Sequence, residues 1–409
     1  MIQIGKKYEY YFKMKTFYNI YLFCALYFYR FLVWICGIFL RRRNASDGVL
    51  FLENFPIENA GYQYRAGKWK TEFEKNGLRC EVWTIFSDKN DFDSQFGNMP
   101  LLYIRAMRKR FRQCVFARKF KTVIVRRELL QFNDYGNLFM EKFLLKIHPN
   151  VILDFDDDIS AAKREPRKIT NLYGRLLQEN GNKFNESLRL YKRFVVGSDY
   201  LKQKVLSENK TIDDDTVLVV PTCVDYDEYP AKVYDECATE VIFGWVGGNH
   251  NLHYLDMLIE PLNRLAVDYK LKLVVVAGRD YEHPKAKFQI ENLKWSLESE
   301  KDLIRSFDVG LMPIEDNAVG RGKCGFKLLQ YMGLGVVSIA TAVTINGDII
   351  EDEKNGFLVK PNNSNWYEII KKVLSLQNKY EEIGRCAKET IQNRYSFGAN
   401  IDSYIRWVY

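Results

Sequence analysis

The residues whose types point most directly to chemistry are Lys323 and Lys327, in a glycine-rich segment between two apolar runs. The segment 322–335 reads GKCGFKLLQYMGLG, which predicts a loop that opens a helix. Lysines four apart lie on nearly the same side of a helix. A helix N-terminus has free N–H groups and a partial positive charge, and Gly325 lets the backbone approach a ligand closely. The segment predicts a diphosphate site, although a glycine-rich turn with solvated lysines fits it equally well.

Two further loops follow apolar runs that predict buried strands. Gly247, Gly248 and Asn249 come directly after 241–246, so their backbone could line the other side of a phosphate pocket. Arg279 follows 271–277 and could face the same phosphates. A plain β-turn and an exposed loop arginine are the alternative interpretations, and the sequence does not decide between them.

A cluster of carboxylates ends another predicted strand, at Asp154 and 156–158. Such a cluster can bind Mg²⁺, accept hydrogen bonds from hydroxyl groups, or raise the pKa of one member so that it acts as a base. A cluster of helix N-cap residues is the alternative. His250 and His253 form the one close histidine pair, and without companion ligands they do not predict a metal site.

An apolar stretch rich in aromatic residues runs from Phe17 to Leu40 and has Arg30 as its one charge. A helix of this length would cover ~36 Å, enough to cross a bilayer core, although Arg30 would be costly in mid-span. Lysines precede the stretch and arginines follow it, so the orientation is open. We expect residues 1–45 to associate with a membrane, and a helix buried in the protein is the alternative.

A basic segment, 105–127, contains ten Lys and Arg and no acid. Ile104, Met107, Phe111 and Val115 recur at helical spacing, with the arginines 105, 108, 110 and 112 off that stripe. The pattern predicts a basic amphipathic helix, with either a solvated outer face or a face that docks on anionic lipid. Nucleic acid is not an expected partner, because no stacking aromatics accompany the charge.

Composition and strand patterning predict two α/β domains. The chain has 409 residues, 47% hydrophobic and 27% charged, and a net charge of +8, which suits an anionic partner without naming one. Its eight scattered cysteines indicate reduced thiols. Short β-rich runs alternate with helical segments from Val49 to Pro221, and a second series begins at Val241. We therefore expect two doubly wound domains, 46–232 and 233–395, that face a cleft, with a final helix, 396–409, returning to the first.

Several segments resemble the group 1 glycosyltransferases, also called glycosyltransferase family 4. The second half carries FGWVGGNHNLHYL (243–255), FDVGLMPIEDNAVGRGKCGFKLLQYMGLGVVSIA (307–340) and IEDEKNGFLV (350–359). The first half carries VLFLENFPIENAGYQYR (49–65), VILDFDDD (151–158), FVVGSDYL (194–201) and VVPTCVD (219–225). The resemblance implies the two-domain GT-B fold and retaining transfer of a sugar from a nucleotide donor, such as a UDP- or GDP-sugar, with no metal or other cofactor.

The resemblance also implies roles for single residues. Lys323 and Lys327 would bind the donor diphosphate, and Glu315 could contact the donor sugar or base. Gly61, in the loop after the first strand, matches the position where the family's glycine loop meets acceptor and donor. Asp157 or Asp158 would face the acceptor. Many members carry two glutamates eight positions apart; here Gln330 takes the ribose-binding position and Gly322 the earlier one.

Together these features predict a membrane-associated glycosyltransferase that builds a surface glycan or lipid-linked saccharide, with its catalytic domains at the cytoplasmic face of the membrane. Because fold does not fix function, a nucleotide-sugar epimerase and a non-catalytic scaffold subunit of the same fold are the alternatives.

Overall fold

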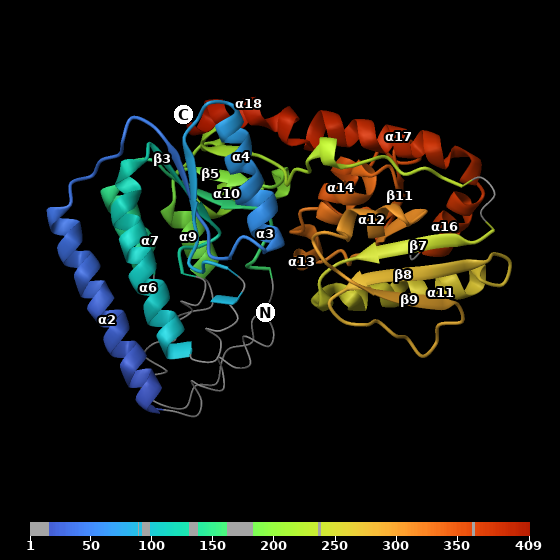
Figure 1. Cartoon of the computed structure of the whole chain (residues 1–409), viewed down its shortest axis with the longest axis horizontal. Coiled ribbons are helices and arrows are strands. Elements are labelled where there is room, and N and C mark those ends of the chain that lie inside the picture. Colours follow the sequence, from blue (N-terminus) through green and yellow to red (C-terminus); the bar gives the residue numbers. More distant parts are fainter. Residues whose placement is uncertain are drawn as a thin grey trace. The chain divides into compact units, whose positions relative to one another are not determined.

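The computed structural model describes residues 16–88, 90–91, 99–130, 138–161, 183–235, 239–361 and 365–409. These residues form two compact units (Figure 1). The first unit contains the described residues up to Val220 together with Ser403–Tyr409, and the second contains Pro221–Asp402. We keep 46–232 and 233–395 as predicted functional domains and describe each unit by itself.

In the described part of the first unit, a parallel sheet has the strand order β2-β1-β3-β4-β5-β6. The order reverses between β1 and β3, which is the topological switch point where such sheets bind ligands. β1, β3 and β4 are buried along their whole length, which explains their nearly continuous apolar sequences. The strands are β1 (Val49–Leu52), β2 (Cys80–Trp83), β3 (Thr122–Arg126), β4 (Val151–Phe155), β5 (Phe194–Val196) and β6 (Val217–Val219).

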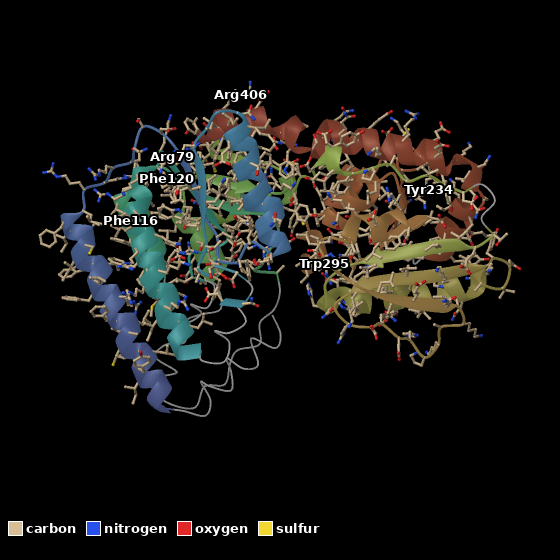
Figure 2. The ribbon with its side chains drawn as sticks, in the orientation of Figure 1. Arg79, Phe116, Phe120, Tyr234, Trp295 and Arg406 are labelled. Atoms are coloured by element: carbon tan, nitrogen blue, oxygen red, sulfur yellow. The ribbon has the colours of Figure 1, made fainter. Side chains whose placement is uncertain are left out.

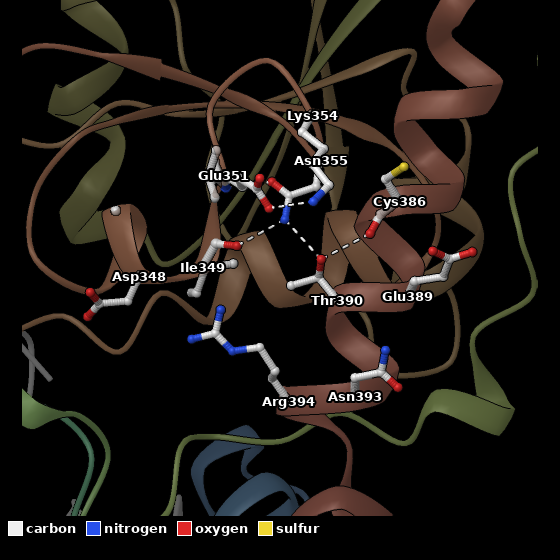
Figure 3. Close-up of a pocket in the computed structure, with 12 residues that line it drawn as sticks. Asp348, Ile349, Glu351, Lys354, Asn355, Cys386, Glu389, Thr390, Asn393 and Arg394 are labelled. Atoms are coloured by element: carbon white, nitrogen blue, oxygen red, sulfur yellow. Dashed lines mark hydrogen bonds and ion pairs between the residues drawn. The ribbon is translucent and has the colours of Figure 1, made fainter.

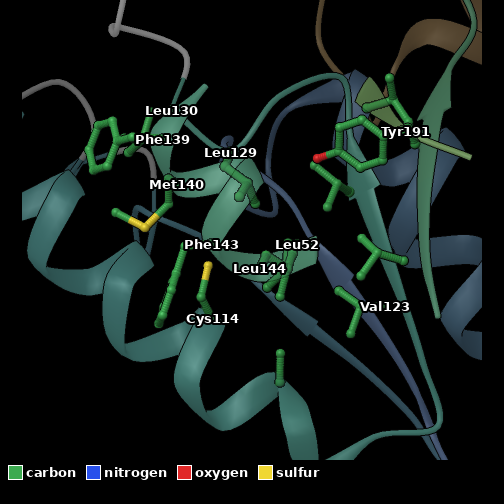
Figure 4. Packing of buried hydrophobic residues seen from close by; sticks show 14 of the residues in the cluster. Leu52, Cys114, Val123, Leu129, Leu130, Phe139, Met140, Phe143, Leu144 and Tyr191 are labelled. Carbon is green, nitrogen blue, oxygen red and sulfur yellow. The ribbon is translucent and has the colours of Figure 1, made fainter. Parts of the chain in front are cut away.

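Helices connect these strands and bury their apolar faces against the sheet. Cys114 of one helix and Met140 and Phe143 of another enter the core beside the strand residues Leu52 and Val123 (Figure 4). The helical segments are α2 (Thr16–Phe39), α3 (Ala60–Tyr62), η1 (Gln63–Gly67), α4 (Lys68–Lys75), α6 (Met99–Phe116), η2 (Ala117–Lys119), α7 (Phe139–Ile147), α9 (Lys183–Leu190), α10 (Asp199–Glu208) and η3 (Asp214–Thr216).

The end of α18 (Phe397–Val408) completes the core of the first unit. The ring of Tyr404 lies 4.9 Å from that of Trp69 and 5.2 Å from that of Phe73. The Thr122 hydroxyl donates to the Val408 carbonyl at 2.7 Å. Near the same strands, Arg79 lies over the ring of Phe120 at 4.5 Å (Figure 2). Residues 403–409 therefore belong to the first unit by packing as well as by hydrogen bonding.

The second unit repeats the plan with a parallel sheet of order β12-β11-β10-β7-β8-β9 among its described residues. Its side chains alternate between two cores: Phe243 and Trp245 enter one, and Val246 enters the other with Val274 and Val276. Both faces are therefore covered, as in a doubly wound sheet. The strands are β7 (Val241–Val246), β8 (Leu271–Ala277), β9 (Gln289–Lys294), β10 (Val309–Met312), β11 (Val337–Thr341) and β12 (Phe357–Val359).

The helical segments of the second unit connect these strands, and α17 and η7 lead into α18. They are η4 (Tyr226–Glu228), η5 (Asn249–Leu255), α11 (Asp256–Leu265), α12 (Glu300–Arg305), α13 (Ala318–Arg321), α14 (Phe326–Gly333), α15 (Ile345–Ile349), α16 (Trp366–Leu374), η6 (Gln377–Lys379), α17 (Tyr380–Thr390) and η7 (Ile391–Tyr395). The predicted α/β class, with two doubly wound sheets and an apolar N-terminal helix, is confirmed.

The apolar helix α2 begins at Thr16 and packs against α6 and α7. Among the described residues, Ile20–Phe39 is the one segment whose length and composition would allow a membrane crossing, although a core helix or a signal sequence meets the same criteria. Only 28% of this segment is buried in the structure, so it is not an ordinary core helix. The lysines that precede residue 16 lie outside the described residues.

One prediction about the basic segment is wrong. Arg110 does not lie on a solvated face of α6 but is fully buried. Its guanidinium donates to the carbonyls of Leu129 at 2.8 Å and Glu53 at 3.0 Å, and to the side chains of Asn54 and Gln113 at 2.9 Å. Burial is tolerated because these acceptors replace the water that the guanidinium loses.

Candidate functional site

The predicted donor-side residues gather at the switch point of the second sheet. β7 and β10 are neighbours there. After β7 the chain continues to β8 on one side of it, and it later returns to β10 on the other side. Gly247 leaves the carboxyl end of β7, and Glu315 follows β10 by a few residues. The loop after α13 then leads into α14, which carries Lys327 in its first turn. Sequence positions about eighty residues apart therefore meet at one edge of the sheet.

Lys327 and Gly247 are in direct contact. A Cβ atom on Gly247 would lie 2.7 Å from Cε of Lys327 and 2.6 Å from Cη2 of Trp245, so only glycine fits. The Lys327 ammonium group lies 5.4 Å from the centroid of the Trp245 ring, and the side chain is half-buried. The buried ring of Trp245 thus supports a cation directly above the carboxyl end of β7.

Lys323 reaches the same loop by another route. It lies in the turn before α14, where Gly325 adopts a left-handed conformation with φ 69° at the helix N-cap. The sequence predicted that both lysines lie on one helical turn. In the structure Gly325 lies between them at the N-cap, so Lys323 precedes α14 and Lys327 lies in its first turn. The Lys323 ammonium donates to Oδ1 of Asn251, in η5, at 3.3 Å. The two ammonium groups therefore approach the segment after β7 independently.

The remaining predicted donor-side residues differ in exposure. Gly248 is exposed, and so is Asn249, whose side chain lies 3.0 Å from the position that a Cβ on Gly278 would take. That contact places Asn249 beside the carboxyl end of β8, where exposed Arg279 follows. Glu315 is exposed and accepts a hydrogen bond from the Asn317 side chain at 2.7 Å.

Gln330 lies in α14 and is almost fully buried. Among the described residues its Nε2 group has no hydrogen-bond partner, which leaves a buried donor unsatisfied. At the carboxyl edge of the same sheet, Tyr254, Ile314 and Val343 form a small buried apolar cluster. The sequence alone does not reveal this cluster, because its members come from η5 and two loops and share no periodicity.

The switch point of the first sheet holds a network of buried charges. Arg126, at the end of β3, pairs with Asp156 at 2.7 Å and lies 3.6 Å from Asp154. Arg65, in the π-helical turn η1, pairs with Asp154 and donates to the Val220 carbonyl at 2.7 Å. Glu53, directly after β1, lies 4.0 Å from Arg126. Glu53 follows β1, Arg126 ends β3 and Arg65 lies in η1, but no sequence pattern singled these three residues out.

The acids of this network have divergent pKa values. Burial would raise the pKa of Asp156, but the guanidinium groups of Arg126 and Arg127 hold it well below its usual range. Burial raises the pKa of Glu53, because it outweighs the lowering effect of Arg126 and two backbone N–H donors. Among the described residues, Nη1 of Arg126 has no hydrogen-bond partner. The switch point thus combines fixed positive charge with a carboxyl group, that of Glu53, whose pKa is raised.

Of the predicted acceptor-side acids, Asp157 and Asp158 differ in environment. Asp157 is part-exposed and pairs with Arg127, a non-glycine residue in the left-handed region at φ 62°, at 3.1 Å. The Asp158 side chain is buried, pairs with Lys204 and accepts two hydrogen bonds from Ser160 at 2.7 and 3.0 Å. Gly61 lies in α3, and its N–H donates to Asn59 at 2.9 Å.

An open pocket of about 590 Å³ lies elsewhere in the second unit, between 347–355 and 386–394 (Figure 3). Hydrogen bonds link part of its lining: the Asn355 amide donates to the Ile349 carbonyl at 3.2 Å and to the Thr390 hydroxyl at 2.9 Å. None of the predicted site residues lines it. Within the described ranges, no group of three or more His, Cys, Asp or Glu residues could hold a metal ion.

Comparisons with known proteins bear on the second unit first. Residues 240–378 match the family model described as glycosyl transferases group 1. This is the segment that holds Gly247, Lys323 and Lys327. It is a group 1 glycosyltransferase domain. A search of curated proteins finds no similar sequence.

Solved structures extend the likeness to both units. A Rickettsia africae glycosyltransferase is 16% identical, with a TM-score of 0.62 over 89% of this chain and 98% of that one. The Anabaena protein HepE, in complex with UDP and glucose, is 14% identical, with a TM-score of 0.57 over 88% and 99%. The lipopolysaccharide outer core galactosyltransferase WaaB is 12% identical, with a TM-score of 0.59 over 88% and 99%. These structures show that the two units together have the GT-B fold, and the family match identifies the second unit as a group 1 glycosyltransferase domain.

Proposed function

We propose that this glycosyltransferase moves a sugar from a UDP- or GDP-sugar, with retention of configuration, to a glycan or lipid-linked acceptor in the synthesis of a cell-surface polysaccharide. The donor would bind at the carboxyl edge of the second sheet. HepE, of the same fold, was solved with UDP and glucose, and WaaB acts on the outer core of lipopolysaccharide. These likenesses support the donor and acceptor classes.

The observation that carries the proposal is the contact of Lys327 with Gly247 at the switch point. Sugar transfer breaks the bond between the anomeric carbon and the donor phosphate, and it leaves negative charge on that phosphate. Lys327, Lys323 and the N-terminus of α14 supply fixed positive charge where the charge develops. The acceptor oxygen bonds to the anomeric carbon, and the departing phosphate accepts the hydroxyl proton. No metal is required in this scheme.

On the acceptor side we retain Asp157, because its carboxylate is open to solvent and Arg127 fixes its position. It would accept a hydrogen bond from an acceptor hydroxyl. Asp158 is committed to Lys204 and Ser160, so we give it a structural role. We also propose that the protein acts at the cytoplasmic face of a membrane, where a lipid-linked acceptor would be presented.

Thermal unfolding with UDP, GDP and the matched nucleosides tests donor binding. We expect one nucleoside diphosphate to raise the melting temperature of the wild type at millimolar concentration and to lose this effect in Lys327→Ala. No shift with either diphosphate would contradict donor binding and would favour a scaffold. Incubation of the donor without acceptor separates the other alternative, because an epimerase interconverts the donor sugar whereas a transferase hydrolyses it slowly.

A further inference from the structure

The outer face of α2 is exposed, apolar and aromatic. Leu22, Leu26 and Val33 point into the core of the first unit, with Tyr29 beside Phe111 of α6 at 6.3 Å between ring centroids. The opposite side carries large apolar side chains at helical spacing, each at least 36% exposed. These are Ile20, Tyr21, Tyr27, Phe28, Phe31, Trp34, Ile38 and Phe39, which we call the aromatic face. A contiguous face of this kind marks an interaction surface.

Cations flank the aromatic face, and exposed acids are absent from the described parts of α2, α6 and α7. Arg108 and Arg112 of α6 are exposed and act electrostatically on Tyr29 of α2. Glu141 is the one acid in these helices, and it is buried. Apolar area with positive charge beside it complements a bilayer whose surface carries anionic lipid.

A pocket of about 290 Å³ joins the two kinds of surface. Its lining is almost wholly apolar and includes Trp34 of α2 and Phe143 of α7, and three basic residues, Arg30, Lys142 and Lys146, also border it. Both lysines are exposed, and the Lys146 chain also lies 3.4 Å from the position that a Cβ on Gly37 would take. Three cations beside an apolar wall fit a lipid phosphate whose acyl chains extend along the helix.

The packing of α2 opposes a membrane crossing. The helix contacts both α6 and α7 and contributes buried residues to the core of the first unit. A crossing would either strip these contacts or bring Arg108 and Arg112 into hydrocarbon, which is costly. Burial on one side and exposure on the other instead suit a helix that lies in the plane of the interface.

We propose that α2 does not span the membrane but docks the first unit on an anionic bilayer, with the aromatic face in the lipid interface and Arg30, Lys142 and Lys146 around one lipid phosphate. This proposal rests on the membrane association proposed above and specifies its mode. It does not depend on donor binding, which involves residues of the second unit.

Co-sedimentation of the full chain with vesicles tests the proposal. Phosphatidylcholine vesicles are compared with vesicles that contain 30% phosphatidylglycerol, and we expect tighter binding to the latter. The variant with Phe28→Ser, Phe31→Ser and Trp34→Ser should bind both at least roughly 100-fold more weakly, because it loses interfacial apolar area. The matched control, Val233→Ser with Val267→Ser, removes exposed apolar side chains of the second unit and should bind normally.

A second variant set separates charge from apolar contact. The substitutions Arg30→Gln, Lys142→Gln and Lys146→Gln should weaken binding to anionic vesicles roughly 100-fold, about fivefold per cation, and leave binding to neutral vesicles unchanged. Lys270→Gln, Lys371→Gln and Lys379→Gln remove the same charge from the second unit as the control. Equal effects of the two triple variants would show only a bulk charge effect and would overturn the phosphate site.

Extraction at alkaline pH in carbonate distinguishes the two modes of attachment. If α2 lies in the interface, carbonate should release the protein into the supernatant. Retention in the membrane pellet would show that α2 spans the membrane and would overturn the proposal. A chain that stays soluble with both vesicle types would also overturn it and would make the aromatic face a protein-docking surface. The melting shift with UDP or GDP, measured on the same variants, should stay unchanged, so failed docking is distinct from failed donor binding.

Discussion

Replacing Lys327 with Ala tests the proposed diphosphate site most directly. The side chain lies beside Gly247, with its ammonium over the Trp245 ring, and it is half-buried. A hydrogen bond to a charged group contributes about 1.5–3 kcal/mol. Because solvent screens this lysine in part, we expect a loss of about 2 kcal/mol of diphosphate binding free energy. The dissociation constant should therefore rise roughly 25-fold.

Titration calorimetry of the wild type, Lys327→Ala and Lys379→Ala measures this loss. Each protein is titrated with the diphosphate that binds, UDP or GDP, and with the corresponding nucleoside. Lys379 is exposed in the same unit, so its loss changes the net charge equally. We expect Lys327→Ala to weaken the diphosphate alone, because the nucleoside offers no phosphate to the ammonium group.

Two results would refute the reasoning. If Lys327→Ala weakened the nucleoside as much as the diphosphate, the lysine would support the pocket rather than bind phosphate. If Lys379→Ala weakened the diphosphate as much as Lys327→Ala, the effect would come from the overall field of the protein and not from a local contact.

Three further predictions concern packing and pH. Gly247→Ala should displace Lys327 and strain the buried Trp245 ring, costing about 1–3 kcal/mol of unfolding free energy and weakening the diphosphate in calorimetry; normal binding would contradict the observed contact. Asp156→Asn should cost about 3 kcal/mol at neutral pH. Because the pKa of Asp156 is depressed in the folded state, the carboxylate contributes its full stabilisation above pH ~4, and this contribution falls as the pH drops below ~4. In denaturant titrations the variant should therefore lose less stability than the wild type on acidification. Leu26→Ala should cost about 2–5 kcal/mol in the first unit, and an unchanged melting temperature would mean that α2 is not packed on it.

Most strands were predictable because parallel strands buried on both faces leave continuous apolar runs. Val241–Val246 and Leu271–Ala277 match β7 and β8 residue for residue. β9 was missed because Gln289–Lys294 is an edge strand with a polar sequence and no buried residue. An edge strand has few packing constraints, so hydrophobic patterning does not mark it.

Candidate site residues could be proposed from the sequence only where one segment holds them. The lysines at 323 and 327 lie in one glycine-rich segment, whereas the charge network of the first unit joins Glu53, Arg65 and Arg126 from three separate elements. Charge periodicity also misassigned Arg110, since its acceptors come from distant loops. Spacing along a chain reports local geometry, and tertiary contacts decide which charges are solvated.

Because the chain passes from the first unit to the second and back again, the first unit is completed last during synthesis. Residues 403–409 finish the first unit, yet the ribosome produces them after the whole of 221–402. At ordinary elongation rates this delay is roughly 10–40 s. During that interval the ring of Tyr404 does not cover Trp69 and Phe73. The incomplete first unit therefore exposes an apolar surface that chaperones can bind. The first unit can therefore be completed only after the whole of the second unit has been synthesised.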